Sequence, residues 1–324
     1  MRLIVTGGAG FVGSTLVRQA VMAGHDVINF DALTASASLA DIWDLEDAPN
    51  YALIPGDVTD RAAFSDLLDR SKPDAVVHLA QEGPHSLADN PTSLVLRTNV
   101  LGTEAVLQAC KAQNVPRVIL AHAMPASTDS PTSPFKASRD SARLVAKAFC
   151  DRHDLPVVHS YAPAVFGPRQ SPADPIAVTM RRLVQGRTVT IPDGPRTAID
   201  LIYVDDYAAA LLWAASDAPV GSSYTFTGPR RIRPLGVARQ ISNALQSKLP
   251  CGDGQYRDHI DVLRVAQGAS QPIAEMEDLE TILGQTPFPP AFAKTVDWMV
   301  DAGLLKPRLA KTAPDLHTVK GVAA

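Results

Sequence analysis

Three glycines near the N-terminus have the spacing of a phosphate-binding turn. Gly7, Gly10 and Gly13 follow the apolar run of residues 3–6 and precede a stretch with helical periodicity. Glycines permit a tight turn and let the backbone approach a pyrophosphate, whose charge is met by amides at the helix N-terminus. Asp31 ends the next apolar run, where a carboxylate can accept hydrogen bonds from ribose hydroxyls. The pattern predicts a dinucleotide site, and Asp31, which would repel a 2′-phosphate, favours NAD over NADP.

A second acidic residue, Asp57, follows a third apolar run in the segment IPGDVTD. Together with Gly56 it is placed at a strand end, where it can contact the adenine of a bound dinucleotide. Aspartate ahead of a helix is also a common cap. A turn or capping role for Asp57 therefore stays open.

These glycines and carboxylates need a parallel sheet to bring them to one edge. In the first half of the chain, continuous apolar runs alternate with amphipathic stretches of helical period, as in βαβ units whose strands are covered on both faces. We therefore predict an α/β fold with a Rossmann doubly wound parallel sheet. The predicted strands are 3–6, 26–30, 51–55, 75–79 and 117–121, and the predicted helices are 13–23, 61–70, 93–113 and 138–153.

Beyond about residue 165, connections rich in proline and glycine separate short elements, which predicts a smaller C-terminal α/β lobe for substrate. We expect residues 1–165 to form an NAD-binding domain and residues 166–306 to form mainly the lobe. Two segments are expected to return to the main domain, residues 156–161 as a strand and residues 201–215 as a strand end and a helix. Residues 307–324 are expected to be a weakly ordered tail.

The composition is that of an ordinary globular protein, with 324 residues of which 46% are hydrophobic. The 30 basic and 34 acidic residues give a formal charge of −4 without a basic run, so neither nucleic acid nor a membrane is an expected partner. Three widely spaced cysteines indicate neither a disulfide framework nor a metal site. The N-terminal apolar run is too short for a signal peptide, and we expect a soluble, cytoplasmic protein.

Several motifs in a fixed order carry a family resemblance. They are MRLIVTGGAGFVG, FDALT, PGDVTD, DAVVHLA, TNVLGT, FGPRQ, DLIYVDD and the late LGQTPFPPAFAKTVDW. With them the chain, from Met1 to about Trp298, resembles the extended short-chain dehydrogenase/reductase family. Within it, the likeness is to nucleotide-sugar 4,6-dehydratases of the dTDP-glucose type and to their epimerase relatives.

The resemblance implies a Rossmann domain that holds NAD and a C-terminal lobe that grips a nucleotide sugar. A hydride would leave the sugar C4 and later return, with loss of water between C5 and C6 in the dehydratases. It also implies a homodimer that pairs through the helices 93–113 and 138–153, with Asn99 beneath the cofactor. The positions implied to bind NAD are Gly7, Gly10, Phe11, Val12, Gly13, Asp31, Asp57, Val58, Leu79, Ala80 and Thr98.

The residues that carry the family's proton chemistry are different in this chain. The family uses a tyrosine that takes the sugar hydroxyl proton and a lysine four residues later, on the same helical face, that lowers the tyrosine pKa. Aligned by position, Phe135 and Arg139 stand there. A second register makes Lys136 the lysine and puts Thr132 in the tyrosine position. Phenylalanine has no proton to exchange, whereas arginine stays charged and can hold the nicotinamide ribose.

A third family residue is a serine or threonine just past the fifth strand, and Ala123 stands in its place. Beside it, His122 is the one titratable residue at this point, and a histidine near neutrality can act as a base. A histidine at a strand end is more often a structural residue. Catalysis by His122 is therefore the less favoured of the two interpretations.

The implied substrate site is also altered. In the segment TAIDLIYVDD, Ile199 replaces an arginine that contacts phosphate in the family, and the two aspartates that follow, Asp205 and Asp206, are predicted to cap the next helix. For the loop QEGPHS, substrate contact and a solvated loop stay equally open. The candidate substrate residues are Glu82, His85, Arg169, Arg196 and Ile191.

Two functions of different classes remain open. The first is an NAD-dependent nucleotide-sugar epimerase or dehydratase with a non-standard acid and base. The second is a catalytically silent protein of the same fold that binds NAD and a nucleotide sugar for regulation. The preserved glycine turn supports the first, and the combined changes at Phe135, Arg139, Ala123 and Ile199 support the second.

Overall fold

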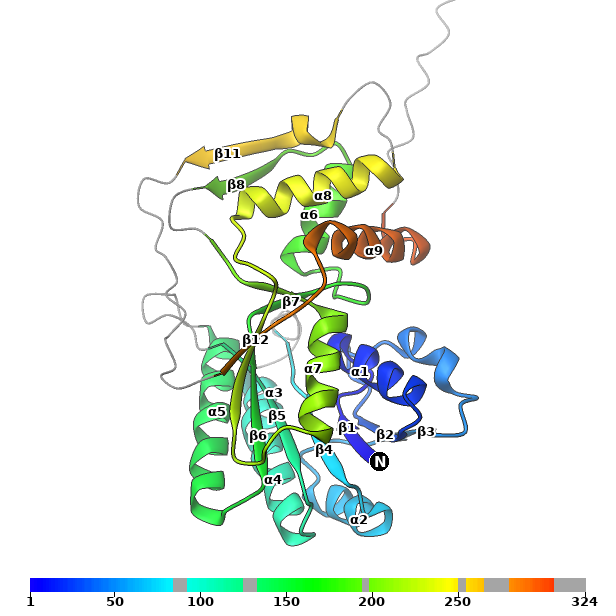
Figure 1. Ribbon diagram of the computed structural model, residues 1–324, viewed down its shortest axis with the longest axis vertical. Helices are drawn as coiled ribbons and strands as arrows, with labels where there is room; N and C mark the ends of the chain where they lie inside the picture. The colour runs from blue at the N-terminus through cyan, green and yellow to red at the C-terminus, as the bar shows by residue number, and fades with distance from the viewer. Residues whose placement is uncertain (84–91, 125–132, 194–197, 250–254, 265–279, 306–324) are drawn as a thin grey trace, which may run out of the picture.

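A parallel sheet of eight strands forms the centre of the computed structural model, which describes residues 1–83, 92–124, 133–193, 198–249, 255–264 and 280–305 (Figure 1). The strand order is β12-β10-β6-β5-β4-β1-β2-β3, and each neighbouring pair is parallel. The order reverses beside β1, as in a Rossmann fold. The strands are β1 (Arg2–Thr6), β2 (Asp26–Asp31), β3 (Tyr51–Pro55), β4 (Ala75–His78), β5 (Val118–Ala123), β6 (Val157–Ala162), β10 (Ser223–Thr227) and β12 (Glu280–Leu283).

Helices cover both faces of this sheet because its strands are apolar on both sides. On one face, α1 (Phe11–Met22) packs against α7 (Val204–Ser216), and the short turn η2 (Trp43–Leu45), which follows the turn η1 (Leu39–Asp41), joins the same core through Leu45. On the other face lie α2 (Arg61–Ser71), α4 (Thr103–Ala112) and α5 (Pro134–His153) (Figure 1). The doubly wound parallel sheet predicted from the sequence is confirmed.

The C-terminal lobe has its own apolar core. It contains α6 (Pro175–Val184), α8 (Pro234–Lys248), α9 (Phe288–Asp301), the turn η5 (Tyr256–His259), and two parallel strand pairs, β7 (Ala164–Phe166) with β9 (Leu201–Tyr203) and β8 (Val189–Asp193) with β11 (Ile260–Arg264). Phe166 and Phe292 stack in this core with ring centroids 4.6 Å apart. Phe11 and Val12, at the start of α1, pack against it. The lobe therefore contacts the helix that follows the glycine turn.

Several elements differ from the prediction. The expected helix 93–113 is divided into α3 (Thr92–Leu96), a π-helical turn η4 (Arg97–Gly102) and α4. Within the segment 201–215, α7 packs on β4, β5 and β6, but β9 pairs with β7 instead of joining the large sheet. The sheet also takes in β10 and β12, which were not predicted. No helix among the described residues is long and apolar enough to cross a bilayer.

The prediction that Asp205 and Asp206 cap α7 is wrong. The N-cap is Tyr203, and no side chain caps the helix. Asp206 instead binds the segment that follows β12, accepting hydrogen bonds from the Thr286 backbone N–H at 2.9 Å and from the Thr286 hydroxyl at 2.6 Å. This clamp ties the C-terminal part of the chain to the helix that covers the sheet.

We predict that Asp206→Ala lowers the free energy of unfolding by about 2 kcal/mol, because two hydrogen bonds to a partly buried carboxylate are lost. Urea denaturation measures the change. The matched control is Asp297→Ala, which breaks an exposed ion pair of 2.9 Å with Lys248 and should cost less than about 1 kcal/mol. Equal losses in the two variants would contradict a special role for the clamp.

Candidate functional site

The glycine turn lies where β1 ends, and its backbone packs too closely for side chains. Gly7 has a φ of +74°, and a Cβ on it would lie 2.7 Å from the Cα of Ala80. A Cβ on Gly13 would lie 2.1 Å from the carbonyl oxygen of Gly7. Gly10 is the N-cap of α1 and no side chain caps the helix, so the first amides of α1 have no intrahelical acceptor. The turn thus presents free N–H groups and the positive end of a helix dipole.

Asp31 closes this turn from the end of β2. Its side chain is 7% exposed and accepts hydrogen bonds from the backbone N–H of Ala9 at 2.9 Å and of Leu33 at 2.8 Å. Both carboxylate oxygens keep further acceptor capacity. The structure therefore places one acceptor-only side chain directly beside the turn, as a ribose diol requires.

The other residues expected at the cofactor lie along the same edge of the sheet. Leu79 donates its backbone N–H to the Thr6 carbonyl at 3.1 Å, and Ala80 donates its backbone N–H to the Thr6 hydroxyl at 3.3 Å. Val58 is buried, and Thr98 lies half-buried in η4. Asp57 is exposed and accepts from the backbone N–H of Thr59 at 2.8 Å, so it forms a turn, while the cap of α2 is Asp60.

Asn99 joins three parts of the site from inside η4. It is fully buried; its side-chain oxygen accepts from the backbone N–H of Glu82 at 2.8 Å, and its amide nitrogen donates to the Glu82 carbonyl at 3.2 Å. The same nitrogen donates to the Ser138 hydroxyl at 2.9 Å, and Ser138 donates to the Phe135 carbonyl at 2.7 Å. Single π turns often mark functional sites. Here the turn connects the segment that follows β4 to the N-terminal part of α5.

Phe135 and Arg139 lie on one face of α5, as their spacing predicts. The helix begins earlier than expected, at Pro134, because Ser133 caps it and accepts from the backbone N–H of Lys136 at 3.2 Å. The Arg139 guanidinium carbon lies 5.2 Å from the centroid of the Phe135 ring, a cation–π contact. Burial lowers the pKa of Arg139, and its Nε has no hydrogen-bond partner among the described residues.

His122 forms a cluster of rings with its neighbours on β6. It is 9% exposed, its Nε2 lies 3.0 Å from His159 Nδ1, and its ring stacks on that of Tyr161 with centroids 5.1 Å apart. Burial, and next the charge of His159, hold the pKa of His122 well below its usual value. His122 is therefore a partnered interior residue. Ala123, the last residue of β5, offers a methyl group and no hydroxyl.

The three described candidate substrate residues each have partners of their own within the protein. Glu82 is 3% exposed, so it is no solvated loop residue, and its carboxylate accepts from the Ser36 hydroxyl at 3.3 Å. Arg169 donates to the Thr15 hydroxyl of α1 at 3.2 Å, which docks the lobe on the main sheet. Ile191 packs against the lobe core. His85 and Arg196 lie outside the described residues.

Ile199 lies beside a cation that the sequence did not single out. It forms an antiparallel bridge with Ile232. The residue before Ile232, Arg231, donates to the carbonyl of Ala198 at 2.7 Å and pairs with Asp200 at 3.3 Å. The Arg231 guanidinium therefore lies close to Ile199, the position at which the family resemblance implied an arginine.

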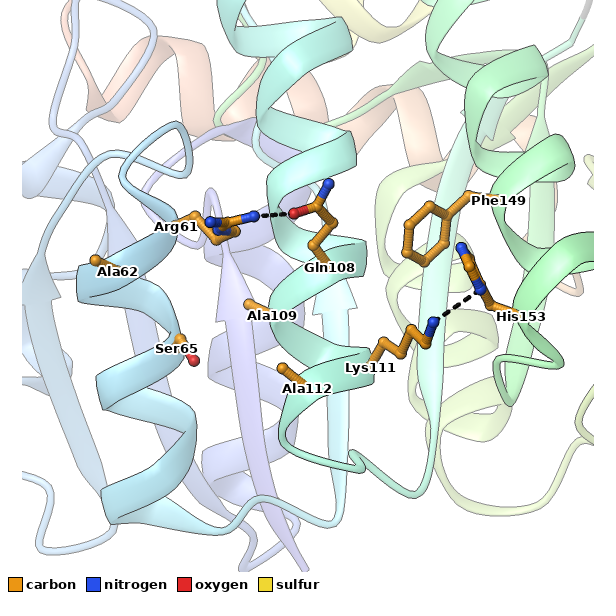
Figure 2. Close-up of a pocket in the computed structure, with 9 residues that line it drawn as sticks. All are labelled: Arg61, Ala62, Ser65, Gln108, Ala109, Lys111, Ala112, Phe149 and His153. Carbon is orange, nitrogen blue, oxygen red and sulfur yellow. Dashed lines mark hydrogen bonds between the residues drawn. The ribbon is translucent and has the colours of Figure 1, made fainter.

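A surface groove of about 670 Å³ lies elsewhere, along α2, α4 and α5 (Figure 2). Phe149 and His153 come from the last turns of α5, and Lys111 donates to His153 Nδ1 at 2.8 Å (Figure 2). Helices of βαβ units run opposite to the strands, so these last turns lie toward the edge where strands begin. The groove is thus separate from the cofactor site.

Three buried polar residues of the site were missed from the sequence, namely Thr6, His78 and Thr103. His78 Nδ1 lies 2.7 Å from the Thr6 hydroxyl, and His78 Nε2 lies 3.0 Å from the Thr103 hydroxyl. A signal was present, because His78 interrupts the apolar run DAVVHLA and a polar side chain in a buried strand must find partners.

The low pKa values of the buried His78 and the half-buried His159 predict acid sensitivity. Burial lowers the pKa of His78 to about 4 and that of His159 to about 4, from 6.5. Below pH 6.5 the unfolded chain therefore binds protons that the folded chain excludes, so the free energy of unfolding falls from pH 6.5 toward pH 4 and is flat above that range. At pH 4 each of the two histidines would lower the free energy of unfolding by up to about 3 kcal/mol.

Urea denaturation between pH 8 and pH 4.5 measures this effect. His78→Gln removes one titrating group, so its slope below pH 6.5 should be shallower than that of the wild type. Val76→Ala, on the same face of β4, should lower the free energy of unfolding by the same amount at every pH. A His78→Gln curve parallel to the wild type would contradict the low pKa of His78.

Comparison with known proteins agrees with this geometry. Residues 3–227 match the NAD dependent epimerase/dehydratase family. A dTDP-glucose 4,6-dehydratase of Neisseria gonorrhoeae is 29% identical over 332 residues, which cover 92% of this chain and 95% of the relative.

Solved structures show the same fold. A dTDP-glucose 4,6-dehydratase of Bacillus anthracis in complex with NAD has a TM-score of 0.75 at 23% identity, over 93% of this chain and 97% of that chain. A dTDP-glucose 4,6-dehydratase of Streptomyces venezuelae with NAD and TYD bound has a TM-score of 0.73 at 25% identity, over the same shares. With more than half of its length matched, the chain belongs to the NAD-dependent epimerase/dehydratase family, and NAD is its cofactor.

Proposed function

We propose that the protein is a nucleotide-sugar epimerase or dehydratase of the dTDP-glucose 4,6-dehydratase type that works with an atypical acid and base. The observation that carries the proposal is the continuity between an NAD cradle, at Gly7 and Asp31, and the first turn of α5, which Asn99 holds through Ser138. Relatives with dTDP-glucose 4,6-dehydratase activity in their names align over nearly the whole chain. A scaffold for hydride exchange beside α5 is thus preserved.

NAD supplies a nicotinamide that takes a hydride from a sugar carbon and can return it. The chain would hold the pyrophosphate at the glycine turn and the adenosine ribose at Asp31. Arg139 keeps its positive charge at the helical position where a lysine would hold the nicotinamide ribose. Phe135 beneath it accepts no proton, and His122 is already bonded to His159. We therefore propose that turnover is slow and limited by proton transfer.

This proposal predicts that Phe135→Tyr raises the rate. The new phenol would lie beside the Arg139 guanidinium, which favours the phenolate and lowers the tyrosine pKa. A positioned general base typically contributes about 10²–10⁴-fold, so we expect a gain of at least about 10². The assay is incubation with NAD and a panel of dTDP- and UDP-sugars in heavy water, followed by chromatography with mass detection.

The matched control is Phe149→Tyr, which adds the same hydroxyl to α5 in the groove of Figure 2 and should leave the rate unchanged. Loss of water marks a dehydratase, and a shifted retention time at unchanged mass marks an epimerase. If neither the wild type nor Phe135→Tyr converts any sugar while both bind NAD and a nucleotide sugar, the enzyme proposal fails. The cation–π pair of Phe135 and Arg139 then belongs to a protein that binds its ligands without converting them.

We further propose that the protein acts in the cytoplasm as a homodimer that pairs through α5 and through the segment 93–113, which forms α3, η4 and α4. The support is a set of exposed leucines, Leu96 (42% exposed) in α3, Leu101 (58%) in η4 and Leu144 (57%) in α5. The π turn η4 packs on both α4 and α5. Exposed apolar side chains on packed helices are a typical protein interface. A reducing compartment suits Cys110 and Cys150, which form no disulfide in the described chain.

The dimer proposal predicts that Leu101→Glu combined with Leu144→Glu yields a monomer, because two charges would have to be buried in the interface. Light scattering behind gel filtration measures the mass. Leu263→Glu, at an equally exposed leucine of β11 in the lobe, is the control and should remain dimeric. A wild-type mass of about 34.5 kDa would overturn the proposal.

A further inference from the structure

A row of buried polar groups runs across the main sheet between the glycine turn and η4. It starts at the backbone N–H of Ala80, passes through Thr6, His78 and Thr103, and ends at the carbonyl oxygen of Asn99. Thr6, His78 and Thr103 are each less than 5% exposed. Polar groups this deep are costly unless all are paired. Their hydrogen positions must therefore be mutually consistent.

Only one direction of donation satisfies every group. Thr103 gives its single hydroxyl hydrogen to the Asn99 carbonyl at 2.7 Å, so it can only accept from His78, whose Nε2 must carry a hydrogen. Burial lowers the pKa of His78 to about 4, so at neutral pH its Nδ1 is a bare acceptor. Thr6 then donates to Nδ1 and accepts from the Ala80 N–H. Each donor meets one acceptor along the whole row.

The two ends of the row lie at opposite parts of the cofactor site. At one end, Thr6 holds Ala80 through its hydroxyl and Leu79 through its carbonyl, and the Ala80 backbone closes directly over Gly7. At the other end, Asn99 holds the start of α5 through Ser138. A shift of one end relative to the other would separate the pyrophosphate turn from the helix that carries Phe135 and Arg139.

We propose that His78 is a positioning residue of the NAD site, a neutral imidazole with its hydrogen on Nε2 that fixes the glycine turn relative to η4 and α5. Its two ring nitrogens play different roles, because Nδ1 accepts and Nε2 donates. A doubly protonated ring has no acceptor for Thr6. The single tautomer of His78 therefore couples the hydrogen bond to Thr6 with the hydrogen bond to Thr103, so that the row acts as one unit.

The test is NAD affinity, measured by calorimetry on the full chain after its nucleotide has been removed. Thr6→Val and Thr103→Val keep the side-chain shape and break the row on either side of His78. Each removes the two hydrogen bonds of one threonine hydroxyl and should raise the Kd for NAD about tenfold. Because the row acts as a unit, the double variant should stay within about threefold of either single variant.

The control is Val76→Ala, which loosens the same face of β4 without touching the row and should change the Kd by less than about twofold. An additive double variant, near a hundredfold, would mean two independent contacts and would overturn the proposal. So would a Val76→Ala variant that loses as much affinity as Thr6→Val, since general loosening would then explain the effect. The measurement needs no sugar substrate, so it is independent of the proposed reaction.

A second readout is a property of the wild type itself and not a loss of affinity in a variant. Nitrogen-15 spectra of the histidine-labelled protein should show His78 at pH 7 with a protonated Nε2 and an unprotonated Nδ1. The signal is assigned by its loss in His78→Gln. The opposite tautomer, or a ring protonated at both nitrogens, would contradict the order of donors that the structure requires.

Discussion

The cofactor half of the molecule depends on backbone meeting backbone without side chains between. The backbone of Gly7 lies so close to Ala80, and that of Gly13 so close to Gly7, that a Cβ on either glycine would clash. This contact brings the ends of β1 and β4 to the N-terminus of α1, so that free amides, a helix dipole and Asp31 converge. The row of buried polar groups behind this contact holds Ala80 in place and so fixes the position of its backbone relative to the glycine turn.

The same constraint explains how cofactor binding and proton chemistry can be separated in one fold. The turn and its polar support involve main-chain atoms and interior side chains, and the hydrogen bond that links them to Phe135 goes to its backbone carbonyl. A change of side chain at position 135 therefore leaves the hydrogen bonds of the scaffold in place. The site can lose or regain a phenol without rebuilding the interior.

Much of the main sheet could be read from the sequence because its signals are local. The strands β1 to β5 are continuous apolar runs, and the glycine turn is required by its own backbone geometry. By contrast, the sequences of β10 (SYTFT) and β12 (ETIL) mix polar and apolar residues, and these strands are defined by pairing with β6 and with each other. The π turn at Asn99 had no local signal, because it depends on Glu82 and Ser138. Likewise, the sequence alone could not distinguish a helix-capping role of Asp206 from its hydrogen bonds to Thr286, which is distant in the chain.

The position of β12 has a consequence for synthesis of the chain. This edge strand comes from residues 280–283, and its neighbour β10 comes from residues 223–227. During translation, β10 can pair with β6 long before β12 has left the ribosome, so its outer edge stays open for some fifty residues of elongation. An open strand edge invites pairing with other chains. The nascent protein therefore passes through a stage at which a chaperone has a defined surface to protect.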